Sequence, residues 1–139
     1  MLRVHAGLMK ELDTDLAAGH GLSLSTYEVL LFLADAPGGK MRMAQLADSV
    51  LLSRSGLTRL VDRLERAGLV EREPCPSDQR GFNALITEEG REVFDAARLT
   101  HLSGVRERFL SRFSDEDLAT MGEFWDRVQP GASSGGGAC

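Results

Sequence analysis

The sequence contains little cysteine, with only Cys75 and Cys139 in 139 residues. Two thiols in a chain of this size do not make a disulfide framework, and they have no metal-ligand spacing. The histidines His5, His20 and His101 lie far apart, without an HxxxH pattern. We therefore predict no metal site and no cofactor.

Long hydrophobic runs are also absent, since no stretch approaches the roughly 18 apolar residues of a membrane span. The first twelve residues carry charges and do not resemble a signal peptide, so we expect a cytoplasmic protein with no membrane partner. The chain has no Ser/His/Asp arrangement and no glycine-rich phosphate loop, and it is too short to hold a separate catalytic domain. We do not expect an enzyme.

The formal net charge of −5 argues at first against a nucleic-acid partner. The charge is unevenly distributed, however: residues 1–39 carry −3, residues 40–81 carry +2 and residues 82–139 carry −4. Because the local field decides where a polyanion binds, the middle of the chain is the candidate DNA-binding region.

One helix dominates that middle region. Leu57, Leu60, Val61 and Leu64 recur at helical spacing and form one apolar stripe. Ser53 suits the N-cap before it, and Gly68 suits the left-handed position after it. Four arginines and small hydroxyl residues occupy the rest of its surface, a pattern that fits a helix inserted into a DNA major groove. An ordinary amphipathic surface helix with solvated arginines is the alternative.

The elements around this helix predict a winged helix-turn-helix. A tight turn at Leu51-Leu52 joins it to a preceding short helix, which begins after an uncapped Arg42 that we do not expect to touch the DNA-binding residues. Strands at 69–73 and 82–86 follow, with 74–81 as an exposed hairpin tip. At the tip, Arg80 can enter a minor groove, and Asp78 can hold that arginine in place. A plain polar turn is the alternative.

The remaining sequence predicts further amphipathic helices. We place them at 2–18, at 26–36 with a Ser25/Glu28 capping box, at 43–50, from Thr87 to about Arg112, and after Ser114. The first and the last two helices carry more apolar surface than one small domain can bury, which favours a homodimer over a bundle within one chain. The predicted fold class is mainly α with a small β-hairpin. The predicted divisions are 1–22 (dimerisation helix), 23–87 (DNA-binding lobe), 88–128 (dimerisation helices) and 129–139 (flexible tail, with Cys139 an exposed thiol).

Four segments of the sequence match one known family: Tyr27-Glu28-Val29-Leu30, the run from Ser53 to Val70, Asp78-Gln79-Arg80-Gly81, and the Leu85–Gly90 run. Through these segments the sequence resembles the MarR family of transcriptional regulators. The resemblance implies a homodimer that binds a pseudo-palindromic double-stranded DNA operator. It implies a repressor released by a small aromatic or phenolic ligand. With Arg63 added from its place on the helix, the DNA-contacting candidates are Ser53, Arg54, Ser55, Thr58, Arg59, Arg63, Asp78 and Arg80.

The effector-binding candidates lie outside the DNA-binding helix. Family ligand sites lie between the dimer helices and the DNA lobe, which makes His5, His20, Tyr27 and His101 candidates here. Three alternatives stay open on the same scaffold: a redox sensor using Cys75, a metal sensor, and a dimeric protein-interaction module that does not bind DNA.

Overall fold

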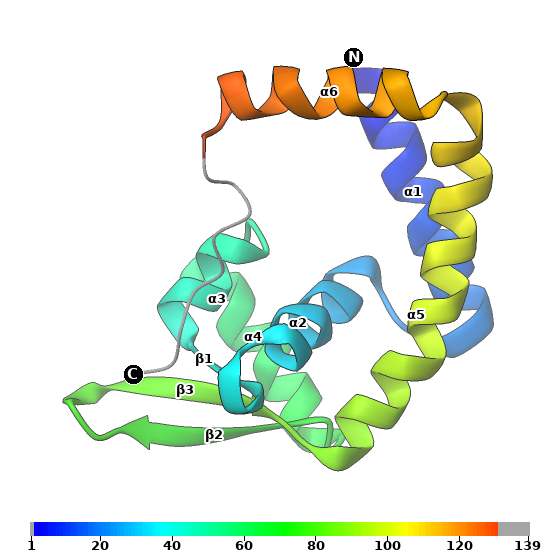
Figure 1. Cartoon of the computed structure of the whole chain (residues 1–139). Helices are drawn as coiled ribbons and strands as arrows, with labels where there is room; N and C mark the ends of the chain where they lie inside the picture. The colour runs from blue at the N-terminus through cyan, green and yellow to red at the C-terminus, as the bar shows by residue number, and fades with distance from the viewer. Residues whose placement is uncertain (1, 131–139) are drawn as a thin grey trace.

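The structure is a computed structural model that describes residues 2–130 (Figure 1). The chain forms helices interrupted by a small sheet. The elements in chain order are α1 (Leu2–His20), α2 (Leu24–Asp35), the 3-10 turn η1 (Pro37–Gly39), β1 (Lys40–Arg42), α3 (Met43–Ser49), α4 (Arg54–Arg66), β2 (Val70–Cys75), β3 (Asp78–Ile86), α5 (Glu88–Arg108), the 3-10 turn η2 (Leu110–Arg112) and α6 (Asp115–Val128).

The sheet has three antiparallel strands in the order β1-β3-β2. Strands β2 and β3 form the hairpin that extends from the lobe in Figure 1, and Val70 pairs with Ile86 at its base. The predicted fold class, mainly α with a β-hairpin wing, is confirmed. Strand β1 was not predicted, because only Met41 of its three residues is buried and so short a segment carries no alternation.

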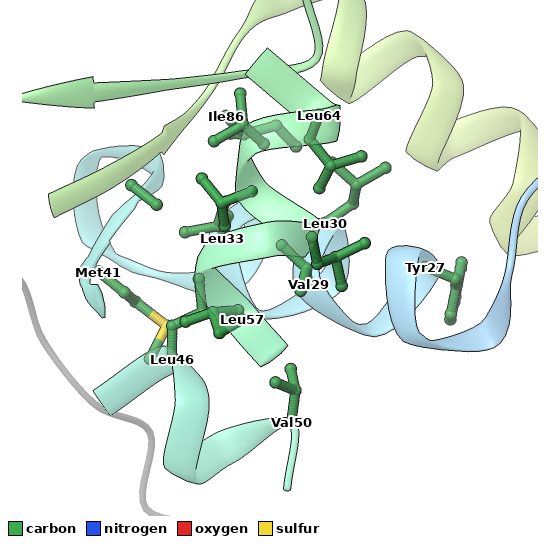
Figure 2. Close-up of a cluster of buried hydrophobic side chains, with 14 of the residues drawn as sticks. Tyr27, Val29, Leu30, Leu33, Met41, Leu46, Val50, Leu57, Leu64 and Ile86 are labelled. Carbon is green, nitrogen blue, oxygen red and sulfur yellow. The ribbon is translucent and has the colours of Figure 1, made fainter. Parts of the chain in front are cut away.

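A hydrophobic core joins α2, α3, α4 and the sheet (Figure 2). Leu30 and Leu33 of α2 pack with Leu46 of α3 and Leu57 of α4, and all four are almost fully buried. The predicted apolar stripe of α4 is therefore the face that holds this helix on the lobe, and its polar arc remains available for contacts.

Helix α6 lies outside this core, whereas α1 and α5 reach it through Leu16, Phe94 and Ala97 (Figure 1). Helix α1 packs along α5, where Arg108 forms ion pairs with Glu11 and Asp15 at 2.9 and 2.5 Å. Helix α6 has no buried residue, and Phe124 and Trp125 stay exposed, as expected for apolar faces that one chain does not cover. No single helix in 2–130 is long and apolar enough to cross a membrane; only α1 with α2, bent by 83°, meets that length and composition.

Several predicted helix ends are confirmed. The Ser53 and Thr87 hydroxyls accept backbone N–H bonds from Gly56 and Gly90, each at 3.0 Å. Gly68 has a φ of 75°, the left-handed conformation expected after a helix. Ser114 caps α6 and forms a reciprocal capping box with Asp117.

Two predicted helix limits are wrong. Helix α2 begins at Leu24 because Ser23, not Ser25, adopts the extended N-cap conformation and accepts the Thr26 N–H at 3.1 Å. Helix α5 ends at Arg108 rather than near Arg112. Phe109 leaves helical geometry there, and its carbonyl accepts the Arg112 N–H in the short turn η2.

The predicted wing tip at 74–81 is also wrong. The strands continue to Cys75 and resume at Asp78, so that only Pro76 and Ser77 lie between them. Pro74 is tolerated within β2 because β2 is an edge strand, where a missing N–H need not break a ladder. The pairing register shifts just after it, between Pro74 and Cys75.

Candidate nucleic-acid interface

The exposed arc of α4 carries the predicted contact residues of this helix. Arg54, Ser55, Thr58, Arg59 and Arg63 are all exposed, on the side opposite the buried leucines. Among residues 2–130, neither Arg54, Arg59 nor Arg63 forms an ion pair, so their guanidinium groups are free to meet an external anion. The Thr58 hydroxyl donates to the Arg54 carbonyl at 2.9 Å and remains able to accept a bond.

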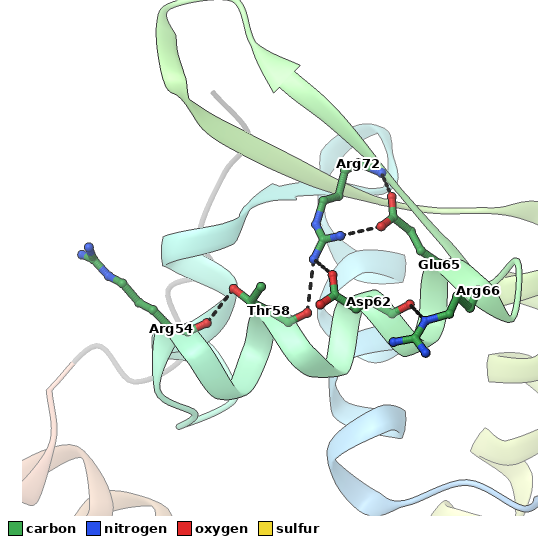
Figure 3. Close-up of polar contacts among 6 residues, drawn as sticks. All are labelled: Arg54, Thr58, Asp62, Glu65, Arg66 and Arg72. Carbon is green, nitrogen blue, oxygen red and sulfur yellow. Dashed lines mark hydrogen bonds and ion pairs between the residues drawn. The ribbon is translucent and has the colours of Figure 1, made fainter.

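Ion pairs made by Arg72 hold α4 against the wing, beside this exposed arc. Arg72 of β2 reaches across to α4, where its guanidinium lies 2.7 Å from the Asp62 carboxylate and 2.5 Å from that of Glu65 (Figure 3). The same group donates to the Thr58 carbonyl at 3.2 Å, and the Arg72 backbone N–H donates to Glu65 at 3.1 Å. One arginine thereby joins the wing to about two turns of the candidate recognition helix.

Sequence reasoning missed Arg72 in this role. A usable signal exists, because period-two alternation in β2 places Arg72 on the opposite face from Glu71 and Glu73. Asp62 and Glu65 sit three residues apart on α4 and therefore share one helix face. What the sequence does not supply is the knowledge that this helix face and this strand face meet.

The wing residues are arranged differently from the prediction. Asp78 accepts the Arg80 backbone N–H at 3.0 Å but does not pair with the Arg80 guanidinium. The other oxygen of Asp78 pairs with the guanidinium of Arg42, which stands at the start of α3. The Arg80 side chain thus stays exposed at the wing, and the expectation that Arg42 does not touch the DNA-binding candidates is wrong.

A groove of about 610 Å³ separates α4 from the wing. Its lining brings together predicted contacts from both elements, namely Arg54, Thr58 and Arg80, and includes the exposed Phe82 of the wing. Arg42 and Arg72, already paired with carboxylates, line it as well. Among residues 2–130, the arginines Arg54 and Arg80 of this groove form no ion pair, whereas its carboxylates, Asp62 and Asp78, do. The groove therefore presents positive charge to an incoming polyanion.

The predicted effector residues divide into two groups. The Tyr27 and His101 rings lie 4.4 Å apart, between α2 and α5, and His20 hydrogen-bonds the neighbouring Thr100 hydroxyl at 2.8 Å. His5 is exposed near the start of α1 and does not join them. The structure thus brings three of the four candidates to the junction of α1, α2 and α5.

Burial shifts the pKa values of two side chains at this junction. Desolvation lowers the pKa of His101, and it raises the pKa of Tyr27, an effect that nearby Arg98 partly offsets. Within the described chain the buried Nδ1 of His101 has no hydrogen-bond partner. A neutral imidazole therefore presents an unsatisfied polar atom beside an aromatic ring.

Cys75 ends β2, buried, with its Sγ 3.7 Å from the Asn83 side-chain oxygen. Its suggested redox role stays a prediction, and Cys139 lies outside the described residues. Among residues 2–130, no three His, Cys, Asp or Glu side chains group as metal ligands.

Comparisons with known proteins agree with this geometry. The model of the MarR family matches residues 20–81. The regulator MhqR of Bacillus subtilis (strain 168) is 31% identical over 109 residues, which cover 78% of this chain and 73% of MhqR. Sco3205 of Streptomyces coelicolor, a MarR-family regulator solved in complex with DNA, superimposes with a TM-score of 0.86 at 34% identity, covering 94% of this chain and 84% of that one. CouR of Rhodococcus jostii RHA1, solved with p-coumaroyl-CoA, has a TM-score of 0.77 at 28% identity and covers 92% and 88%.

Proposed function

Because this chain belongs to the MarR family of winged-helix, DNA-binding transcriptional regulators, which are not enzymes, we propose that it is a homodimeric repressor released by a small aromatic ligand. It acts in the cytoplasm on a pseudo-palindromic operator. The observation that carries the proposal is the arc of unpaired arginines on α4, held against the wing by Arg72.

The DNA contacts follow from that surface. Helix α4 and its N-cap enter the major groove, where arginine bonds guanine bidentately and hydroxyls bond phosphates or base edges. The contacting residues of this element are Ser53, Arg54, Ser55, Thr58, Arg59 and Arg63. Arg80 extends from the wing toward the neighbouring minor groove, and Asp78 orients its backbone. The DNA complex of Sco3205, a protein with the same fold, supports this assignment.

The dimer follows from the apolar surface that one chain leaves open. Leu2 and Val4 of α1 and Phe124, Trp125 and Val128 of α6 are exposed, which is unfavourable for a monomer in water. A second copy covers these faces, so that residues 1–22 and 88–128 act as dimerisation segments around the lobe of 23–87. Two lobes then place their α4 helices in successive major grooves, about 34 Å apart.

The effector site lies at the junction of α1, α2 and α5. The Tyr27 and His101 rings, which lie 4.4 Å apart, form the aromatic side of this site, and the buried Nδ1 of His101, without a hydrogen-bond partner among residues 2–130, offers a polar anchor for a hydroxyl or carboxylate. The relative CouR, solved with p-coumaroyl-CoA, supports an aromatic acid or its thioester as the ligand class. Binding there acts on both the dimerisation helix α5 and the lobe helix α2.

Fluorescence anisotropy tests the DNA assignment. The duplex is the DNA directly upstream of the protein's own gene, a scrambled duplex is the control, and salt is varied. We expect at least about a thousand-fold preference for the specific duplex. Arg59→Ala should weaken binding about 10- to 100-fold, and Arg80→Ala should weaken it with less loss of sequence preference.

The matched control is Arg106→Ala, which removes the same charge from an exposed position on α5. Its affinity should stay within about twofold of wild type, because charges beyond a Debye length are largely screened. Equal binding by wild type and both lobe variants would overturn the assignment. Absence of any DNA affinity at low salt would instead favour a protein-interaction module.

A further inference from the structure

The turn between α3 and α4 contains a backbone feature that local sequence does not favour. After α3, the Leu51 N–H donates to the Asp48 carbonyl at 3.4 Å and the Leu52 N–H donates to the Ala47 carbonyl at 3.0 Å. This is the Schellman arrangement, in which the residue after the C-cap adopts the left-handed conformation. Leu51 occupies that position with a φ of 55°, and it is the one non-glycine residue with positive φ among those described.

Glycine is the residue that normally fills this position, because a Cβ atom clashes with the following carbonyl in left-handed geometry. The Leu51 side chain does not offset that strain within the chain, since it is 90% exposed. Its neighbours behave oppositely: Val50 is buried, and Leu52 packs against the core. Strained residues that gain nothing from their own fold are typical of functional contacts.

We propose that Leu51 makes an apolar contact with DNA, an inference that rests on the proposed function. Leu51 stands two residues before Ser53, the N-cap of α4, and Leu51, Ser53 and Arg54 are all exposed. The apolar groups of a duplex within reach of such an edge are the thymine C5-methyl and the deoxyribose carbons. Leu51 thereby adds a contact that the arginines, which bind guanine and phosphate, do not provide.

The test compares two variants with wild type on a duplex that wild type selects from a random pool. Leu51→Gly relieves the strain and removes the side chain, so we expect a higher urea midpoint together with operator affinity about three- to tenfold lower. Leu51→Met keeps both the strain and an apolar side chain, and should bind within about twofold of wild type. A stability gain with an affinity loss cannot come from misfolding.

Replacing each thymine of the selected duplex by deoxyuridine, which lacks the methyl group, identifies the contacted atom. If the contact is to a thymine methyl, one replacement weakens wild type about threefold and leaves Leu51→Gly unchanged. If no replacement does so while Leu51→Gly still binds weakly, the contact is to deoxyribose.

Leu51→Gly binding as tightly as wild type would overturn the proposal and leave the DNA-binding function intact. Affinity lost equally by Leu51→Gly and Leu51→Met would overturn it too. Failure of wild type to select any duplex would remove the function itself and this inference with it.

Discussion

Arg72 should determine both the stability of the lobe and its affinity for DNA. We consider Arg72→Met, which keeps the length and apolar stem of the side chain but removes the guanidinium. The variant loses the bonds to Asp62, Glu65 and the Thr58 carbonyl and retains the backbone bond to Glu65. The carboxylates of Asp62 and Glu65 then share one face of α4 without a cation between them.

The exposure of the partners sets the size of the effect. Exposed ion pairs contribute about 0–1 kcal/mol, whereas removing one partner of a fully buried pair costs about 3–5 kcal/mol. The Arg72 side chain is 20% exposed, while Asp62 and Glu65 are 42% and 35% exposed, so the stranded carboxylates can regain water. We therefore expect a loss of about 2 kcal/mol, which corresponds to about a 30-fold change in the folding equilibrium.

Urea denaturation followed by circular dichroism measures this loss. Arg72→Lys, which keeps the charge but not the planar fork, should recover about half of it. A double-mutant cycle of Arg72→Met with Glu65→Gln should give a coupling of about 1 kcal/mol. The control Arg106→Met makes the same replacement at an exposed site on α5 and should change the free energy of unfolding by less than about 0.5 kcal/mol.

DNA affinity is the second readout. Without Arg72, the carboxylate of Asp62 lines the proposed DNA-binding groove without a cation beside it, so operator binding should weaken more at low salt than at high salt. A loss of stability below about 0.5 kcal/mol in Arg72→Met would refute the reasoning, because it would mean that these bonds are no better than those to water.

Three further predictions test other parts of the molecule. Trp125→Asp places a charge on the open face of α6, so analytical ultracentrifugation should detect monomer at micromolar concentrations where we expect wild type to be a dimer. Gly90→Ala brings a Cβ into a clash with the Leu69 carbonyl oxygen, and thermal denaturation should reveal a loss of about 2–3 kcal/mol. Burial lowers the pKa of His101, so the unfolded chain takes up its proton first, near pH 6.5, and stability falls as pH drops below that value. Wild type should therefore lose more stability than His101→Asn between pH 7.5 and 5.5, and equal losses would contradict the burial of His101.

The parts of the fold that the sequence predicted depend on local signals. Periodicity and capping rules describe interactions between residues that are close in sequence. The N-cap at Ser53, the left-handed Gly68 and the apolar stripe of α4 are all of this kind. For the same reason the exposed arc of α4 could be predicted residue by residue. The start of α2 was misplaced because Ser23 and Ser25 are both able to cap, and the choice between them depends on how the preceding turn leaves α1.

The parts that the sequence did not predict depend on contacts between distant segments. Strand β1 exists because Lys40 and Met41 pair with Leu85 and Ala84 of β3, and nothing in three residues indicates such a pairing. The Arg42–Asp78 ion pair joins residues 36 positions apart, so charge patterning along a single element does not reveal it. The effector candidates also depend on distant contacts. Only the packing of α1, α2 and α5 shows that His20, Tyr27 and His101 lie at one junction while His5 does not.

These distant contacts also explain how an acidic chain presents a positive surface. Of the six carboxylates in 40–81, four form ion pairs: Asp62 and Glu65 with Arg72, Glu73 with Lys40, and Asp78 with Arg42. Three cations are used in this way, and each comes from β1 or β2, while the arginines of α4 and Arg80 form no ion pair among residues 2–130. Pairing therefore does more than stabilise the wing on the helix. These ion pairs neutralise most of the carboxylates of the lobe and leave the arginines of α4 and the wing unneutralised. The local electrostatic field at the DNA-binding surface is therefore set by this pairing rather than by the net charge of −5.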